Sequence, residues 1–232
     1  MLLAFNTIIT EKYKISFDEK TLPFIMNGFP YEIIHLGDDK LNDFRVDDKV
    51  FSKYTHLLVT GSSLSASQGS EFDEIIIKVI QYFIKIQKPI LGICHGHQML
   101  ARAILGNSAC RKAITPEFGW KKMQIKANSL FKGILNPVFL ESHYDEVCNL
   151  PEEFIIIATN NECEVQAFQY KNLPVWGVQF HPEMQFENGT EMLQDHIKEY
   201  SHDKEFYRNE LDTKLQIKQN FLIFKNFINS VK

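Results

Sequence analysis

The chain has 232 residues, of which 44% are hydrophobic and 23% are charged, and its net charge at pH 7 is −4. This composition is typical of a globular protein with a sizeable core, and the slight acidity argues against nucleic acid or an anionic membrane as partner. No apolar run is long enough to span a membrane, and the first residues lack the pattern of a signal peptide. We therefore expect a cytoplasmic protein.

The first half of the chain alternates short apolar runs with a helical pattern. The apolar runs predict strands at residues 2–8, 31–36, 56–60 and 89–93. Residues 70–86 begin with a helix-start signal and continue with apolar residues at helical spacing. This strand-helix-strand order predicts an α/β fold, with a mostly parallel sheet covered by helices on both faces.

The second half contains strands that follow one another closely. Apolar runs predict them at residues 120–127, 138–142, 154–159, 164–170 and 175–180. We expect some of these strands to be antiparallel, because the gaps between them are too short for crossover helices.

The chain becomes charged and helical after residue 185. Apolar residues at helical spacing predict a final helix that packs its apolar stripe on the main body: Ile217, Phe221, Phe224 and Ile228. We therefore expect one main domain at residues 1–185, and a helical extension at 186–232 that packs on the same domain.

The cysteines separate into one candidate for chemistry and three ordinary residues. Four cysteines without a C-x-x-C pair are too few for a disulfide framework and do not indicate a zinc site. Cys110, Cys148 and Cys163 are predicted to be small buried residues. We expect neither a metal nor a cofactor.

Cys94 lies where an apolar run meets a helical pattern, inside the sequence Gly92-x-Cys94-x-Gly96. This arrangement is typical of a nucleophile elbow, with sulfur in place of oxygen. The turn is sharp, so side chains at the two glycines would collide with the neighbouring strand and helix. The helix N-terminus favours a thiolate, and the backbone N–H of His95 is aimed at the oxyanion that forms when the thiolate attacks a carbonyl.

His181 supplies the base that such a thiol needs. It ends the apolar run at 175–180, and Pro182 and Glu183 follow it. A histidine can take the proton of the thiol, and a carboxylate can hold that histidine in the correct tautomer. Cys94, His181 and Glu183 are therefore predicted to form a catalytic triad.

The two motifs together resemble the class I, or triad, glutamine amidotransferases. The matching segments read GICHGHQ at 92–98 and GVQFHPE at 177–183, and EFGW at 117–120 and SHYDEV at 142–147 are similar to the branch that includes GMP synthase. The resemblance implies a flavodoxin-like three-layer α/β sandwich with a mixed, mostly parallel sheet and a C-terminal helical extension. It also implies Cys94 as nucleophile, His181 as base and then acid, and Glu183 as the residue that orients His181.

The resemblance extends to the residues around the triad. It implies that Gln98 and the segment Ser142, His143, Tyr144 and Asp145 contact the glutamyl group. The second oxyanion donor of the family lies in a loop commonly written Gly-Gly-Pro, whereas this chain has Gly61 and Ser62 in that loop. A backbone N–H of Gly61 or Ser62 can still donate beside that of His95.

The reaction that these residues predict is hydrolysis of a γ-glutamyl amide, glutamine or a γ-glutamyl peptide, through a γ-glutamyl thioester. The leaving amine stays open. A glutaminase subunit would deliver ammonia to a separate synthetase chain, since this sequence has no ATP-binding signature. A stand-alone γ-glutamyl peptidase would need no partner, and its loop at Gly61 and Ser62 resembles such enzymes. A third possibility is a catalytically silent regulatory subunit.

Overall fold

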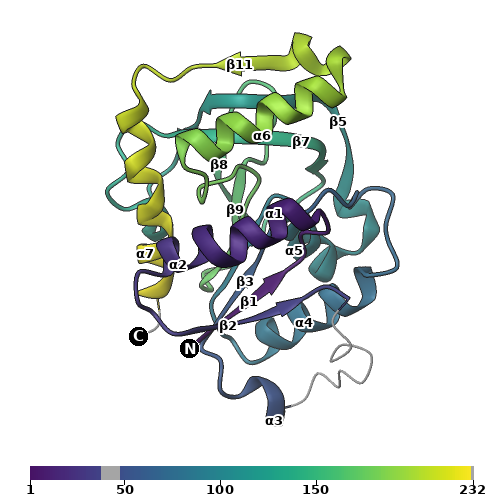
Figure 1. Ribbon diagram of the computed structural model, residues 1–232. Helices are drawn as coiled ribbons and strands as arrows, with labels where there is room; N and C mark the ends of the chain where they lie inside the picture. The colour runs from purple at the N-terminus through teal and green to yellow at the C-terminus, as the bar shows by residue number, and fades with distance from the viewer. Residues whose placement is uncertain (38–47, 231–232) are drawn as a thin grey trace.

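The computed structural model describes residues 1–37 and 48–230, and its main element is an eight-stranded sheet (Figure 1). The strands follow the order β2-β1-β3-β4-β10-β9-β8-β6. The first five strands in this order are mutually parallel: β2 (Tyr31–His35), β1 (Leu2–Asn6), β3 (His56–Val59), β4 (Ile90–Ile93) and β10 (Val175–Val178). The last three are antiparallel: β9 (Ala167–Tyr170), β8 (Phe154–Thr159) and β6 (Gln124–Ile125).

Helices cover both faces of this sheet, because both faces of its parallel strands are apolar. One face packs against the segment formed by α1 (Glu11–Ser16), the π-helix η1 (Phe17–Thr21) and α2 (Leu22–Met26), and against α7 (Leu222–Ile228). The other face packs against α4 (Asp73–Lys85) and α5 (His95–Leu105). The short helix α3 (Asp48–Phe51) precedes β3. The parallel part has the flavodoxin-like order, and the predicted three-layer fold is confirmed.

A second, smaller sheet lies beside the main one, in the order β11-β5-β7. It consists of β5 (Cys110–Lys122), β7 (Val138–Val147) and β11 (Tyr207–Asn209), and α6 (Phe186–Glu199) packs on it through the apolar cluster that includes Trp120, Leu140 and Leu193. Figure 1 shows these elements above the main sheet. The remaining short helices are of the 3-10 type: η3 (Asn107–Ala109), η4 (Ser129–Phe131), η5 (Ser201–Phe206) and η6 (Lys214–Phe221).

The structure corrects several predicted boundaries in the second half. The run at 120–127 is not one strand, because the chain leaves β5 after Lys122 and joins the main sheet as β6. β5 begins at Cys110, in a polar stretch that contains an irregularity between Lys112 and Glu117, and this polarity is why an apolar pattern missed it. β7 likewise continues to Val147 through polar residues.

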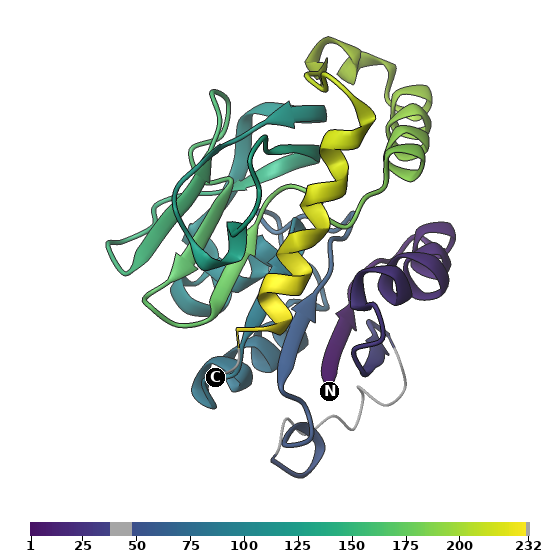
Figure 2. The ribbon, with the colours of Figure 1, turned by 90° about the vertical axis from the view of Figure 1, so that its left-hand side faces the viewer.

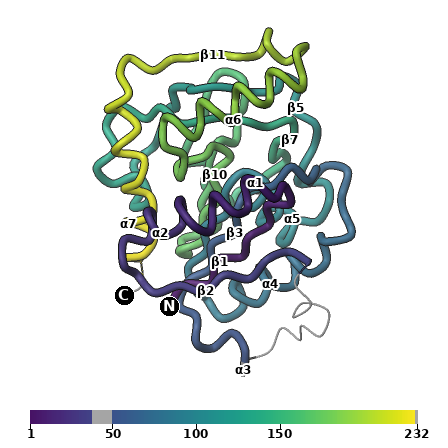
Figure 3. The backbone as a smooth tube through the Cα atoms, in the orientation of Figure 1, coloured from purple at the N-terminus to yellow at the C-terminus, as the bar shows by residue number. Residues whose placement is uncertain are grey.

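The C-terminal segment is helical as expected but also contributes a strand. β11 pairs parallel with β5, and a Cβ built on Gly119 would lie only 1.8 Å from the carbonyl oxygen of Arg208, so this pairing requires glycine at position 119. The predicted final helix is η6 followed by α7, and both run along the molecule in Figure 2. The two termini lie at the same end of the main sheet (Figure 3), where His56 Nε2 lies 3.1 Å from the carbonyl oxygen of Ile228.

Candidate active site

Cys94 occupies a sharp turn between β4 and α5. Its backbone has φ = 50° and ψ = −108°, a conformation that is strained for any residue with a side chain. A Cβ built on Gly96 would lie 2.3 Å from the carbonyl oxygen of Val59, and one on Gly92 would lie 2.4 Å from the carbonyl oxygen of Gly96. Both glycines are therefore required by close backbone approach, as expected for a nucleophile elbow.

The Cys94 side chain lies in a buried, mostly neutral environment. Its relative exposure is 5%, and its backbone N–H donates to the carbonyl oxygen of Val178 on the neighbouring β10 at 2.8 Å. The sulfur lies 3.9 Å from the carbonyl oxygen of Ser142 and 3.6 Å from Nε2 of Gln179. The thiol therefore contacts β7 of the small sheet as well as the main sheet.

His181 and Glu183 form a hydrogen-bonded pair beside Cys94. Nδ1 of His181 lies 2.7 Å from Oε1 of Glu183, which leaves Nε2 to face the sulfur. Burial alone would lower the pKa of His181, but the charges of Glu183 and Cys94 raise it well above its usual value. The backbone N–H of His181 donates to the carbonyl oxygen of Leu140 at 2.8 Å, so β7 also holds the histidine in place.

Gly61 lies against both reactive side chains. A Cβ built on it would be 3.0 Å from Cε1 of His181 and 3.4 Å from Cβ of Cys94. Its carbonyl oxygen accepts hydrogen bonds from the hydroxyls of Thr7 and Thr60 at 3.2 and 3.1 Å. These bonds turn the carbonyl away from the site, which makes the loop suited to present N–H groups there.

The other predicted oxyanion donors lie at the same place. His95 is the first residue of α5, where backbone N–H groups have no partner within the helix. Burial lowers the pKa of the His95 ring to about 4, so this ring is neutral at pH 7 and the N-terminal dipole is the nearest positive contribution of α5. The hydroxyl of Ser62 accepts from the N–H of Leu64 at 3.3 Å, within the loop.

The predicted glutamyl contacts divide between the site and its supports. Ser142 contacts Cys94 through its carbonyl oxygen. Nε2 of Gln98 donates to the carbonyl oxygen of Asp145 at 2.8 Å and to Oε1 of Gln179 at 3.0 Å. Tyr144 lies on the α6 side of β7, where it contacts His196 and Asp203. The structure thus brings Ser142 to Cys94 and places Tyr144 elsewhere.

The Asp145 carboxylate holds the loop that follows β3. It accepts from the hydroxyl of Ser65 at 2.7 Å and from the N–H and hydroxyl of Ser67 at 3.0 and 2.8 Å, and it pairs with Lys112 at 3.0 Å. Burial would raise the pKa of Asp145, but these donors lower it below its usual value. Asp145 therefore anchors the loop that begins at Gly61 and Ser62.

Behind the site lies a cluster of buried charges that the sequence pattern did not single out. Nε2 of His143 lies 3.2 Å from Glu117 and 3.3 Å from Glu141, and Nζ of Lys121 lies 2.7 Å from Glu117. Burial alone would lower the pKa of His143, but the two carboxylates raise it to about 10. His143 thus belongs to this cluster, and only the motif at 117–120 in the sequence could have indicated Glu117.

Gln179 is a second residue that the sequence analysis missed. It is fully buried, and its amide bridges Gln98 and the sulfur of Cys94. The available signal was a lone polar residue within the apolar run at 175–180.

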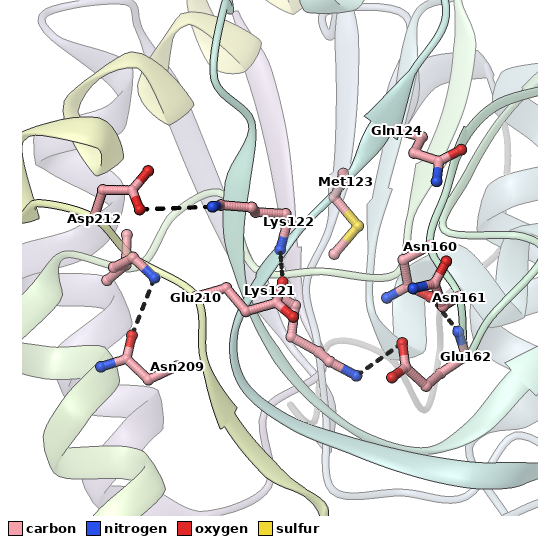
Figure 4. A pocket seen from close by; sticks show the side chains of 11 residues that line it. Lys121, Lys122, Met123, Gln124, Asn160, Asn161, Glu162, Asn209, Glu210 and Asp212 are labelled. Carbon is pink, nitrogen blue, oxygen red and sulfur yellow. Dashed lines mark hydrogen bonds and ion pairs between the residues drawn. The ribbon is translucent and has the colours of Figure 1, made fainter.

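The largest pocket of the described residues lies away from the triad. It measures about 490 Å³ and is polar (Figure 4). Its walls come from β5, β6, the loop after β8 and the segment after β11: Lys121, Lys122, Met123, Gln124, Asn160, Asn161, Glu162, Asn209, Glu210, Leu211 and Asp212. No residue predicted for the site lines it. Within the described part of the chain, no helix is long and apolar enough to cross a bilayer, and no three His, Cys, Asp or Glu side chains are grouped to hold a metal ion.

The fold and the elbow define a class of proteins, and sequence comparison identifies it. Residues 31–200 match the family model described as "Glutamine amidotransferase class-I". The chain belongs to this family.

Curated relatives within the family are glutamine-hydrolysing subunits of GMP synthase. The one from Pyrococcus furiosus is 36% identical over 124 residues, which cover 52% of this chain and 65% of that protein. The one from Methanothermobacter thermautotrophicus is 34% identical over 139 residues, which cover 59% of this chain and 70% of that protein. The chain thus spans less than two thirds of the Pyrococcus protein.

Solved structures agree on the fold. A glutamine amidotransferase from Thermotoga maritima matches with a TM-score of 0.69 at 20% identity, covering 99% of this chain and 98% of that one. A glutamine amidotransferase from Methylobacillus flagellatus matches with a TM-score of 0.71 at 14% identity, covering 98% and 93% of the two chains.

Proposed function

We propose that this chain hydrolyses the γ-amide of glutamine through a thioester on Cys94. The observation that carries the proposal is the juxtaposition of the Cys94 elbow with the hydrogen-bonded pair of His181 and Glu183. The names of the archaeal relatives, which describe glutamine-hydrolysing proteins, support glutamine as the substrate.

The proposed reaction uses groups that already lie around the sulfur. The Cys94 thiolate attacks the γ-carbonyl carbon, and backbone N–H groups of His95 and the Gly61 loop stabilise the oxyanion. The C–N bond then breaks as His181 gives its proton to the leaving amine. His181 next takes a proton from water, which attacks the thioester and releases glutamate. Glu183 stabilises the charged histidine through both steps.

We further propose that the ammonia passes to a separate synthetase chain. The archaeal relatives are named as subunits of a synthase, which supports this assignment. The second candidate is a stand-alone γ-glutamyl peptidase, and the observation that favours it is the loop at Gly61 and Ser62, which lacks the Gly-Gly-Pro sequence. A catalytically silent regulatory protein is the third possibility, and the intact triad argues against it.

The test is to assay the purified chain with glutamine and with γ-glutamyl dipeptides, alone and with the synthetase component of an archaeal GMP synthase. Glutamine hydrolysis that rises when the synthetase is added supports ammonia delivery. Release of glutamate from dipeptides by the chain alone supports the peptidase. Absence of both activities with every addition would support the silent regulatory protein.

Substitutions in the triad separate enzymatic turnover from contaminating activity. His181→Ala should reduce the rate by about 10²- to 10⁴-fold, because the thiol loses its base and the leaving amine its acid. Cys94→Ser should have a comparable effect, Glu183→Ala a smaller one, and the effects should be strongly non-additive because the residues act as a unit. Cys148→Ser is the matched control, since Cys148 is buried but bonded to Ser108. A wild-type rate in His181→Ala would refute the mechanism.

A further inference from the structure

The side-chain amide of Gln179 contacts the sulfur of Cys94 from the side of the main sheet. Gln179 follows β10 and precedes His181 by two residues, and its side chain is fully buried. Nε2 lies 3.6 Å from the sulfur, and Oε1 lies 3.0 Å from Nε2 of Gln98. A buried amide with both ends engaged has one orientation, so the question is which end faces the sulfur.

A backbone carbonyl decides this orientation. The carbonyl oxygen of Asp145 can only accept, and it lies 2.8 Å from the Gln98 side chain, so the NH₂ group of Gln98 must face it. The second hydrogen of the same NH₂ group points to Gln179, which must therefore present its oxygen. The NH₂ group of Gln179 is left to face Cys94. The relay runs from β7 through two amides to the sulfur.

The two neighbours of the sulfur favour different protonation states. A thiol can donate its hydrogen to the carbonyl oxygen of Ser142, which lies 3.9 Å away. A thiolate has no hydrogen to give and is stabilised by a donor, and Gln179 supplies one. The N–H group of Gln179 therefore acts in favour of the form that attacks the substrate.

We propose that Gln179 is a further catalytic residue, whose amide N–H donates to the Cys94 thiolate, and that Gln98 is the positioning residue that aims it. The inference rests on the proposed function, in that Cys94 is the nucleophile. It assigns Gln98 a role that does not require contact with the substrate.

The test measures how alkylation of Cys94 by iodoacetamide depends on pH, with the site of modification read by mass spectrometry. Iodoacetamide reacts with the thiolate, so the midpoint of the profile reports how readily the thiolate forms. In Gln179→Met, which keeps an unbranched chain but removes the donor, the midpoint should move up by about one pH unit. At pH 7 the alkylation rate should fall several-fold. Gln179→Glu should shift it further, because a carboxylate opposes the thiolate.

Two further variants complete the design. Gln98→Leu should shift the midpoint in the same direction by a smaller amount, because the freed Gln179 amide can rotate. Gln169→Leu is the control for loss of an interior glutamine, since Gln169 bonds Asn128 and Leu173 on β9 and should leave the profile unchanged. An unshifted profile in Gln179→Met and Gln179→Glu, with wild-type circular dichroism, would overturn the proposal. Alkylation needs no turnover, so a chain that hydrolyses no γ-glutamyl amide but shows the shifts would reject only the proposed function.

Discussion

Cys94 and His181 meet in one site but are held there by two different kinds of structure. Around Cys94 the main sheet and α5 approach so closely that only glycine fits at positions 92 and 96, and the contacts to the sulfur come from neutral groups. His181 is instead fixed by the small sheet, through its hydrogen bond to Leu140 on β7. The comparison teaches that one half of the site depends on shape and the other on a sheet that carries buried charge.

The charged half is stabilised by mutual compensation. Glu117, Glu141 and His143 are each almost completely buried, where an isolated charge would be costly. Burial would raise the pKa of Glu117, but His143 and Lys121 lower it, whereas burial raises the pKa of Glu141 to about 7. Loss of one member therefore leaves the others buried without compensation. The following predictions test whether the two halves respond differently to substitution.

The largest effect should come from Gly96→Ala. The new methyl group would lie 2.3 Å from the carbonyl oxygen of Val59, so β3 and α5 must separate. We expect a loss of about 3 kcal/mol or more in the free energy of unfolding, measured by urea denaturation. Gly28→Ala is the control, because nothing lies within 4 Å of its Cβ position and only backbone strain of about 1 kcal/mol results. Equal urea midpoints for the two variants would contradict the assignment of shape to this half.

Glu117→Gln should have an effect of similar size through a different cause. It removes the carboxylate shared by His143 and Lys121 while keeping the volume of the side chain. Breaking a buried ion pair in this way costs about 3–5 kcal/mol, which the same urea titration would detect. Glu162→Gln is the control, since Glu162 is partly exposed and pairs with Lys121 at 3.2 Å, and it should cost less than about 1 kcal/mol. If both variants are equally mild, the cluster does not stabilise the small sheet.

The smallest effect should be a pH dependence that belongs to His143. Its pKa in the folded state is raised from 6.5 to about 10, so its pairing contributes full stability below pH 6.5 and loses it as the pH rises toward 10. The difference in unfolding free energy between wild type and His143→Gln should therefore shrink from pH 6.5 to pH 10. A difference that grows over this range would show that His143 is neutral in the folded protein.

The same contrast explains which parts of the structure could be predicted from the sequence. The parallel strands are buried on both faces, so their apolar runs predicted β1, β2, β3 and β4 closely. β11 and the start of β5 were missed because their residues are polar and partly exposed. The elbow and the His-Pro-Glu turn are local motifs and were visible in the sequence. The Gln98 and Gln179 relay depends on a carbonyl of β7, and no sequence pattern specifies that contact.

The left-handed backbone at Cys94 has a consequence for how this protein can be improved. Any residue with a side chain at φ = 50° carries strain of about 1–2 kcal/mol, and glycine would relieve it. A search for more thermostable variants that ignores activity would therefore be drawn toward glycine at position 94, at the expense of the nucleophile. Stabilising substitutions compatible with turnover should be sought in the small sheet and the C-terminal helices instead, because the elbow trades stability for reactivity.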